Sequence, residues 1–111
     1  MADPVRAPAA PPLDPVIHQA TRLRILAALY RNREASFTSL RDGLGLTDGN
    51  LASHAQRLEA AGYVTSGRVL SNLSFEVRYR ITPKGSDAFR AYLDGLKALL
   101  AEVEGAEAPP G

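Results

Sequence analysis

The chain contains no cysteine, which excludes disulfide scaffolds, thiol nucleophiles and thiolate metal sites. It has two histidines, His18 and His54, which are too few for a histidine-rich metal site. No apolar run approaches the roughly 18 residues that a membrane span requires, and the N-terminus has no apolar signal core. We therefore expect a cytoplasmic protein with no metal site and no cofactor.

Patterns that would indicate an enzyme are also missing. The 111 residues suffice for one small domain, which has little room for an enclosed active site. The sequence has no Ser/His/Asp arrangement in a plausible register and no carboxylate pair with an evident geometry. The nearest approach to a phosphate-binding loop, Gly43-Leu44-Gly45, lacks a third glycine and a preceding strand. The sequence thus predicts a protein without catalytic activity.

Charged residues are unevenly distributed, although the net charge is only +1. Nine arginines against five acidic residues give residues 22–83 a charge of +4. The flanking segments 1–21 and 84–111 carry −1 and −2. Arginine is the side chain best suited to forked contacts with phosphates and guanine edges. The basic middle favours a nucleic-acid partner only slightly, because an ordinary solvated surface also explains it.

Both termini have compositions that do not support a packed element. Residues 1–13 are rich in proline and alanine and residues 105–111 are similar, so we predict disordered tails there. Asp14 and Pro15 are typical of an N-cap and a first helical position. An apolar stripe near the 3.6-residue period then predicts a helix from Pro15 to about Arg31.

Two further helices follow, separated by a short turn. Thr38 is the predicted cap of a short helix over residues 39–44. Thr47 is the predicted N-cap of a longer helix that ends at Gly62. Apolar residues at i, i+4 and i+7 give that helix a buried face, namely Leu51, Ala55 and Leu58. The short turn between the helices contains a glycine, which is the pattern of a helix-turn-helix.

After Gly62 the apolar period changes from 3.6 to 2, which is typical of β-strands. We predict a hairpin with strands at about 63–70 and 75–81, joined by a polar tip at 71–74. The opposite face of the second strand carries charged residues and is expected to be wet and partly cationic. Its apolar face is predicted to lie on a core and consists of Phe75, Val77, Tyr79 and Ile81.

Thr82 and Pro83 repeat the cap-and-proline signature and begin a long helix, which we predict over residues 83–104. Its apolar residues recur at spacings of 4, 3, 4 and 3, as in a heptad seam: Phe89, Leu93, Leu96, Leu100 and Val103. Such a seam can cover a core within the chain. We favour a dimerisation seam between two chains, because the small domain at 14–82 leaves the helix little to cover.

The order helix, short helix, turn, helix, hairpin and helix is that of a winged helix-turn-helix, an α+β fold that is mostly α. The segments HQATRLRILAAL, SFTSLRDGLGLTDGNLASHAQRLEAAGYV and YRITPKGSDAFRAYLDGL resemble the compact winged-helix transcriptional regulators of the MarR/ArsR-like group. The resemblance spans residues 14–103, and G-Y-V followed by Y-R-I-T-P-K-G is its most specific part. It implies a homodimer that binds double-stranded DNA and regulates transcription.

In this fold the helix after the turn enters the DNA major groove and the hairpin contacts the flanking backbone. Asparagine can pair with adenine, arginine with guanine, and serine or histidine with bases or phosphates. Asp48 departs from this pattern, and its carboxylate either accepts from a cytosine amino group or helps to cap the helix. The resemblance implies DNA contacts by Thr47, Asn50, Ser53, His54 and Arg57 on the helix and by Arg68 and Arg78 on the hairpin.

Two residues and the function itself allow more than one interpretation. His54 is favoured as a DNA contact over a solvated surface residue or a metal ligand, and Arg78 is either a phosphate contact or an edge charge that discourages aggregation. We expect a repressor, because a lone domain has no activation module. A winged helix can instead bind proteins, and a groove between dimer helices could bind a small-molecule effector. The outer face of the helix lacks the apolar anchors of protein interfaces, which favours DNA.

Overall fold

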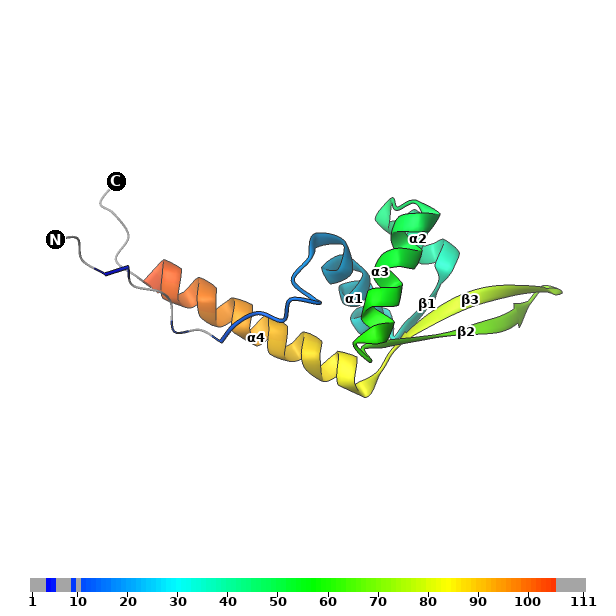
Figure 1. Cartoon of the computed structure of the whole chain (residues 1–111). Helices are drawn as coiled ribbons and strands as arrows, with labels where there is room; N and C mark the ends of the chain where they lie inside the picture. The colour runs from blue at the N-terminus through cyan, green and yellow to red at the C-terminus, as the bar shows by residue number, and fades with distance from the viewer. Residues whose placement is uncertain (1–3, 6–8, 10, 106–111) are drawn as a thin grey trace.

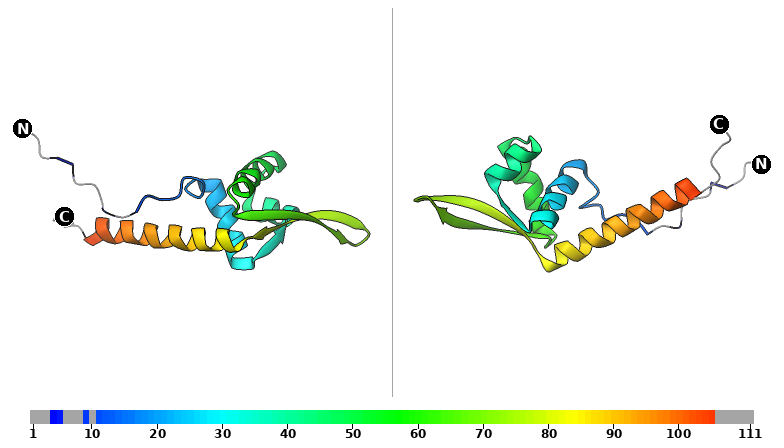
Figure 2. Two further views of the ribbon diagram at one scale, coloured as in Figure 1. Left: turned by 60° about the horizontal axis from the view of Figure 1, so that its bottom comes forward. Right: turned by 180° about the vertical axis from the view of Figure 1, so that it is seen from behind.

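The computed structural model describes residues 4–5, 9 and 11–105. The elements along the chain are α1 (Ala20–Asn32), β1 (Glu34–Ser36), α2 (Phe37–Leu44), α3 (Asp48–Ala60), β2 (Val64–Ser71), β3 (Ser74–Ile81) and α4 (Pro83–Gly105). The first three helices cluster together, and the β2–β3 hairpin and α4 project from opposite sides of the cluster (Figures 1 and 2). The predicted fold, a winged helix-turn-helix with a long C-terminal helix, is confirmed.

The three strands form one antiparallel sheet in the order β1-β3-β2. β3 lies in the middle and pairs with β2 along its whole length, beginning with Val64 opposite Ile81. The hairpin turns through Asn72 (φ 49°) and Leu73 (φ 66°). A positive φ at both central residues is typical of the type I′ turn, whose twist matches that of the two strands. The hairpin is therefore a regular, twisted β-ribbon.

The core lies where α1 and α3 meet the base of the sheet. Tyr79 of β3 and Phe89 and Tyr92 of α4 enclose it from the other side. Burial of one such apolar side chain is worth about 1.5–3 kcal/mol, so the buried faces determine how each helix is rotated. The predicted inward face of α3 is confirmed. The largest fully buried side chains are Ile17, Ile25, Leu26, Leu29, Leu51 and Leu58.

The first helix begins at Ala20. The prediction that it begins directly after Asp14 is wrong. Asp14 caps only a single turn, in which the His18 N–H group donates to the Asp14 carbonyl (2.7 Å). Gln19 is then extended (φ −146°, ψ 131°), and its side chain provides the N-cap of α1. Ile17 lies in the single turn and is fully buried. Tertiary burial thus outweighs the local preference of the Asp-Pro sequence for a continuous helix.

The cap of α2 differs from the predicted one, whereas the cap of α3 is confirmed. The Oγ atom of Ser36, and not that of Thr38, accepts from the Ser39 N–H group (3.1 Å). Ser36 is the last residue of β1 and already has the extended backbone that an N-cap needs, so α2 begins earlier than predicted. Thr47 accepts from the Asn50 N–H group (3.1 Å), as predicted for α3.

A glycine sets how closely α4 approaches the segment before β2. The Thr82 hydroxyl accepts from the Gly85 N–H group (2.9 Å) and donates to the Gly62 carbonyl (2.6 Å). A Cβ atom at Gly85 would lie 2.1 Å from the carbonyl oxygen of Tyr63. No other residue fits this position without a shift of the backbone. This close contact explains why the T-P-K-G segment ends in glycine.

The prediction that the hairpin lays its apolar face on a core holds only at its base. Tyr79 is buried there, and Ile81 packs beside it. Phe75 and Val77 on the same face are 64% and 37% exposed, so the prediction is wrong for these two residues. The hairpin extends beyond the helices (Figure 1). Alternation along a strand gives the direction of each side chain but not the reach of the neighbouring elements.

The apolar seam of α4 lies in two environments. Phe89 is buried in the core of its own chain, and Leu93 and Leu96 pack half-buried against the same core. Leu100 and Val103 at the far end are 47% and 60% exposed. The prediction that the whole seam faces a second chain is wrong for Phe89, because α1 lies beside the first half of α4 and covers it.

The predicted terminal tails fall mostly outside the described residues. Leu13, the last residue of the predicted N-terminal tail, instead packs against the core. Its Cδ2 atom lies 3.3 Å from the position of a Cβ atom built on Gly95 of α4. The predicted tail therefore ends too late, since proline-rich composition does not show that a following leucine has a surface to cover. Gly105, the first residue of the predicted C-terminal tail, is the last residue of α4.

Candidate nucleic-acid interface

One face of α3 is polar and open to solvent. The opposite face is held in the core by Leu51 and Leu58, which are fully buried, so the rotation of the helix is fixed. Asn50, Ser53 and Arg57 are exposed. At 100° per residue these three lie on one side of the helix. The structure thus gathers three of the predicted contacts into a single polar surface that begins at the N-terminus of the helix.

The same face contains a residue that the sequence analysis missed. Gln56 is exposed and follows Asn50 and Ser53 at intervals of three residues. Its side-chain amide can pair bidentately with adenine, as that of asparagine can. Counting outward from the buried positions at the helical period would have included it. Thr47 is exposed as well, but its hydroxyl is already used to cap the helix.

The carboxylate at the start of α3 is paired with α2. Nη1 of Arg41 lies 3.0 Å from Oδ1 of Asp48, and Nε of Arg41 lies 2.9 Å from Oδ1 of Asp42. Asp48 is in the first turn of α3, where the helix dipole favours a negative charge. The pair is solvent-exposed and contributes little stability. Its main effect is to offset the negative charge that Asp48 would otherwise present at the leading end of the helix.

His54 lies at the flank of the polar face, half-buried beside α1. Its Nδ1 atom is 3.2 Å from Nη1 of Arg22. Burial lowers the pKa of His54 from its ordinary value, and the positive charges of Arg22 and Arg57 lower it further. The lowered pKa favours the neutral form of the imidazole at pH 7. Its place between two helices was not predicted, because the contact joins residues far apart in the sequence.

Arg68 and Arg78, the two predicted wing contacts, lie on opposite faces of the hairpin. Arg68 pairs with Val77 in the β2–β3 register, so it shares a face with Phe75. It is exposed, and its guanidinium carbon lies 5.2 Å from the centre of the Phe75 ring. A cation over an aromatic face is attracted by the ring quadrupole. This contact orients the arginine along the outer half of the wing.

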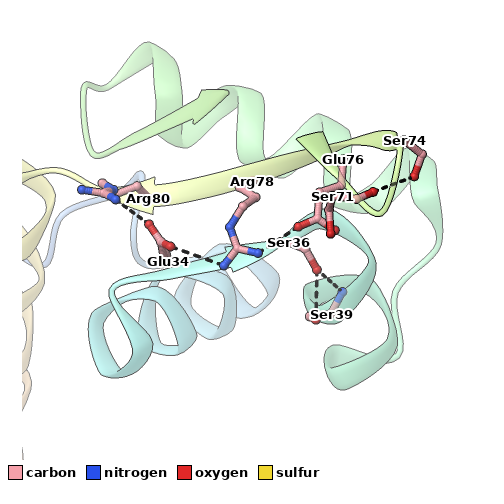
Figure 3. Close-up of polar contacts among 8 residues, drawn as sticks. All are labelled: Glu34, Ser36, Ser39, Ser71, Ser74, Glu76, Arg78 and Arg80. Atoms are coloured by element: carbon pink, nitrogen blue, oxygen red, sulfur yellow. Dashed lines mark hydrogen bonds and ion pairs between the residues drawn. The ribbon is translucent and has the colours of Figure 1, made fainter. Parts of the chain in front are cut away.

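Arg78 belongs to an ion-pair cluster that joins β1 to β3 (Figure 3). Its Nη1 is 3.0 Å from Oε1 of Glu76 and its Nη2 is 3.4 Å from Oε1 of Glu34. Nη2 of Arg80 lies 2.6 Å from the other oxygen of Glu34. Arg80 and then Arg78 lower the pKa of the Glu34 carboxyl. The guanidinium of Arg78 is therefore already paired with two carboxylates of its own chain, those of Glu34 and Glu76.

Two further properties concern only the part of the chain that the structure describes. Within it, no helix is long and apolar enough to cross a membrane. No group of three or more His, Cys, Asp or Glu residues among the described positions is arranged to hold a metal ion.

A three-helix cluster with a helix-turn-helix, a β-hairpin wing and an open polar face on the second helix of the turn defines a winged-helix DNA-binding protein. Residues 21–100 match the model of a protein family described as the winged helix DNA-binding domain. The chain belongs to this family.

Known relatives agree with this assignment. An uncharacterized protein of Methanocaldococcus jannaschii is 33% identical over 89 residues, which cover 80% of this chain and 97% of the relative. The structure of a transcriptional regulator homologue protein from Pyrococcus horikoshii OT3 is similar, with a TM-score of 0.76 and 30% identity over 80% of this chain and 88% of that one. The antimony-specific transcriptional repressor AntR has a TM-score of 0.59 and 28% identity over 81% and 75% of the two chains.

These similarities confirm the resemblance to winged helix-turn-helix transcriptional regulators. They identify the chain as a DNA-binding regulator, with double-stranded DNA as its partner.

Proposed function

We propose that this protein is a homodimeric, sequence-specific repressor that binds an inverted repeat in double-stranded DNA. The observation that carries the proposal is the open polar face of α3, whose opposite face is locked into the core by Leu51 and Leu58. A helix held in this way presents the same side chains to every DNA duplex that it meets. Short and medium hydrogen-bonding side chains are suited to a major groove about 12 Å wide.

The side chains on α3 and on the wing have different tasks in this proposal. Asn50, Ser53, Gln56 and Arg57 read base edges, because amide and guanidinium groups match the donor and acceptor patterns of adenine and guanine. Arg68 contacts phosphates, which positions the protein without specifying a sequence. Thr47 contributes by capping the N-terminus of α3, the end of the helix that leads into the groove. Arg78 acts mainly within its own chain, since its guanidinium is paired with Glu34 and Glu76.

The far half of α4 is the proposed dimer contact. Leu100 and Val103 are exposed there, and Leu93 and Leu96 are only half-buried. Full burial of one such side chain is worth about 1.5–3 kcal/mol. Association costs on the order of 4–15 kcal/mol, so several of these residues must be covered in both chains. A two-fold dimer would place its α3 helices roughly 34 Å apart, one turn of DNA, and would therefore favour an inverted repeat.

Repression is the proposed direction of regulation. A dimer bound across one face of a promoter blocks the polymerase without any further contact. AntR, which is 28% identical to this chain, is named as a transcriptional repressor.

The decisive experiment selects duplexes from a random pool with the purified protein. We expect an enriched inverted repeat with half-sites about 10 base pairs apart and an affinity that falls as salt is raised. Absence of enrichment together with salt-independent binding would contradict DNA recognition and favour a protein-interaction module. In a reporter that carries the selected site across its promoter, we expect transcription to fall when the protein is added. A rise would contradict repression.

A further inference from the structure

We propose that Arg22 of α1 is a positioning residue that holds His54 as an Nε2–H donor for an acceptor atom on DNA. The inference rests on the proposed function, because it assigns a role within the same interface.

Arg22 is a buried arginine with an unusual set of partners. The residue is only 9% exposed. Its Nε atom donates to the carbonyl of Val16 (2.6 Å), and its Nη1 atom contacts Nδ1 of His54 (3.2 Å). No ion pair joins it to a carboxylate among the described residues. The guanidinium is thus held between a backbone carbonyl and an imidazole.

This contact determines the protonation state of the imidazole. A guanidinium can only donate hydrogen bonds, so Nδ1 of His54 must accept and carries no proton. A neutral imidazole then has its proton on Nε2. The groups that face the ring are Arg22 from α1 and Arg57 from α3, both positive, and both oppose a second proton. Arg22 thereby selects one tautomer out of two.

The Nε2 atom is available for an outside partner. Within the described residues, the only buried side-chain nitrogen or oxygen without a hydrogen bond is Oε1 of Glu59. Among the residues that the structure describes, His54 has no hydrogen bond other than that with Arg22. Nε2 is therefore not fully enclosed by the protein, and His54 lies next to Ser53 and one turn before Arg57 along α3. Its N–H group fits a base acceptor, such as guanine O6 or adenine N7, or a phosphate oxygen.

The first test measures the tautomer in the full-length protein without DNA. Nitrogen-15 NMR of the two histidine rings distinguishes Nδ1–H from Nε2–H directly. We expect His54 to be almost entirely the Nε2–H form at pH 7. His18, whose Nδ1 lies 2.9 Å from the Tyr92 hydroxyl, is the second histidine in the spectrum and serves as the reference ring. An Nδ1–H or doubly protonated His54 at pH 7 would overturn the inference, whatever the protein binds.

The second test removes the positioning group. Arg22→Met keeps an unbranched apolar stem but no donor, and Arg22→Lys keeps a charged donor. In the Met variant we expect mixed tautomers of His54 and DNA affinity about fivefold lower, as for the loss of one hydrogen bond. The Lys variant should lie closer to the parent in both measurements. Circular dichroism checks that each variant is folded.

The third test separates positioning from simple structural damage. In a His54→Ala background, the further change Arg22→Met should no longer alter DNA affinity, because the two residues act through one contact. An undiminished effect of Arg22→Met in that background would overturn the inference. Relaxed preference at one base pair in His54→Ala indicates a base acceptor, and an equal loss on all sequences indicates a phosphate. If the parent binds no duplex at all, the proposed function fails, while the ring NMR still tests the Arg22 contact.

Discussion

Helices α3 and α4 are both amphipathic, but only α3 has its apolar face covered completely by its own chain. Leu51, Ala55 and Leu58 of α3 are all buried. On α4 the apolar stripe begins buried at Phe89 and ends exposed at Val103. Figures 1 and 2 show the reason, since α3 lies within the helix cluster and α4 extends well beyond it.

The difference separates what each helix can do. A helix whose inward face is fully covered has a fixed rotation and is suited to present side chains for recognition. A helix whose apolar stripe extends beyond its domain exposes apolar surface to water. Such a surface is suited to association with another chain. The same periodicity in the sequence therefore supports two functions.

The strongest contrast is expected between the two ends of α4. Phe89→Ala should lower the free energy of unfolding by about 3–5 kcal/mol, because it leaves a cavity in the core. The matched change Val103→Ala should alter it by less than about 0.5 kcal/mol at concentrations that keep the chain monomeric. Urea denaturation of dilute protein measures both. Similar losses for the two variants would contradict the division of the stripe.

Charges in the exposed half of α4 should separate association from folding. The double change Leu100→Asp with Val103→Asp is expected to give a folded monomer in sedimentation. Its affinity for the selected inverted repeat should fall roughly 100-fold or more, because two linked half-sites bind far more tightly than one. Asp94→Asn, which alters charge elsewhere on α4, is the control. A double mutant that remains dimeric would place the interface elsewhere.

Gly85 of α4 and Gly49 of α3 each lie in the first turn of a helix. Replacing them compares how closely the two helices are packed at that turn. Gly85→Ala places a Cβ atom 2.1 Å from the Tyr63 carbonyl oxygen and should cost about 3 kcal/mol, at the upper end for overpacking. Gly49→Ala meets nothing within 4 Å and should stabilise by about 0.5–1 kcal/mol, because glycine is unfavourable in helices. Thermal unfolding measures the two shifts, which should have opposite signs.

Substitutions in α3 and in the wing should affect DNA binding in different ways, because α3 is proposed to read bases and the wing to contact phosphates. Asn50→Ala and Arg57→Ala are each expected to cost about 1–3 kcal/mol on the preferred site and to relax preference at one base pair. Arg68→Ala should weaken binding to all sequences about equally and flatten its salt dependence. Binding titrations on specific and random duplexes at several salt concentrations make the comparison. If all three variants behave alike, α3 does not read bases.

The smallest effect is expected from Glu34, at the base of the sheet. Its folded-state pKa is lowered by Arg80 and Arg78, so its contribution to stability is present above the ordinary carboxyl pKa and is lost as the pH falls through the lowered value. Glu34→Gln should therefore be slightly less stable than the parent at pH 7 and equal to it in strong acid. Thermal unfolding across this pH range measures the difference in stability between the variant and the parent. A difference that grows on acidification would contradict the assignment of the ion pairs to Glu34.

Much of the fold follows from local patterns. The change of period after Gly62, the cap at Thr47 and the inward face of α3 all depend on residues within a few positions of one another, and each was predicted correctly. The polar face of α3 follows from the same pattern, although Gln56 was overlooked on it. These features are predictable because caps and helical periodicity act over one or two turns.

The sequence by itself determined the order of the helices and the hairpin, the rotation of α3 and the presence of an apolar stripe on α4. Tertiary structure alone decided that His54 meets Arg22, that Arg78 meets Glu34 and that α1 covers Phe89 but not Val103. The first two contacts join residues 32 and 44 positions apart. Such partners are chosen by how helices and strands pack, and that packing depends on the burial of the whole core and not on the residues beside each site.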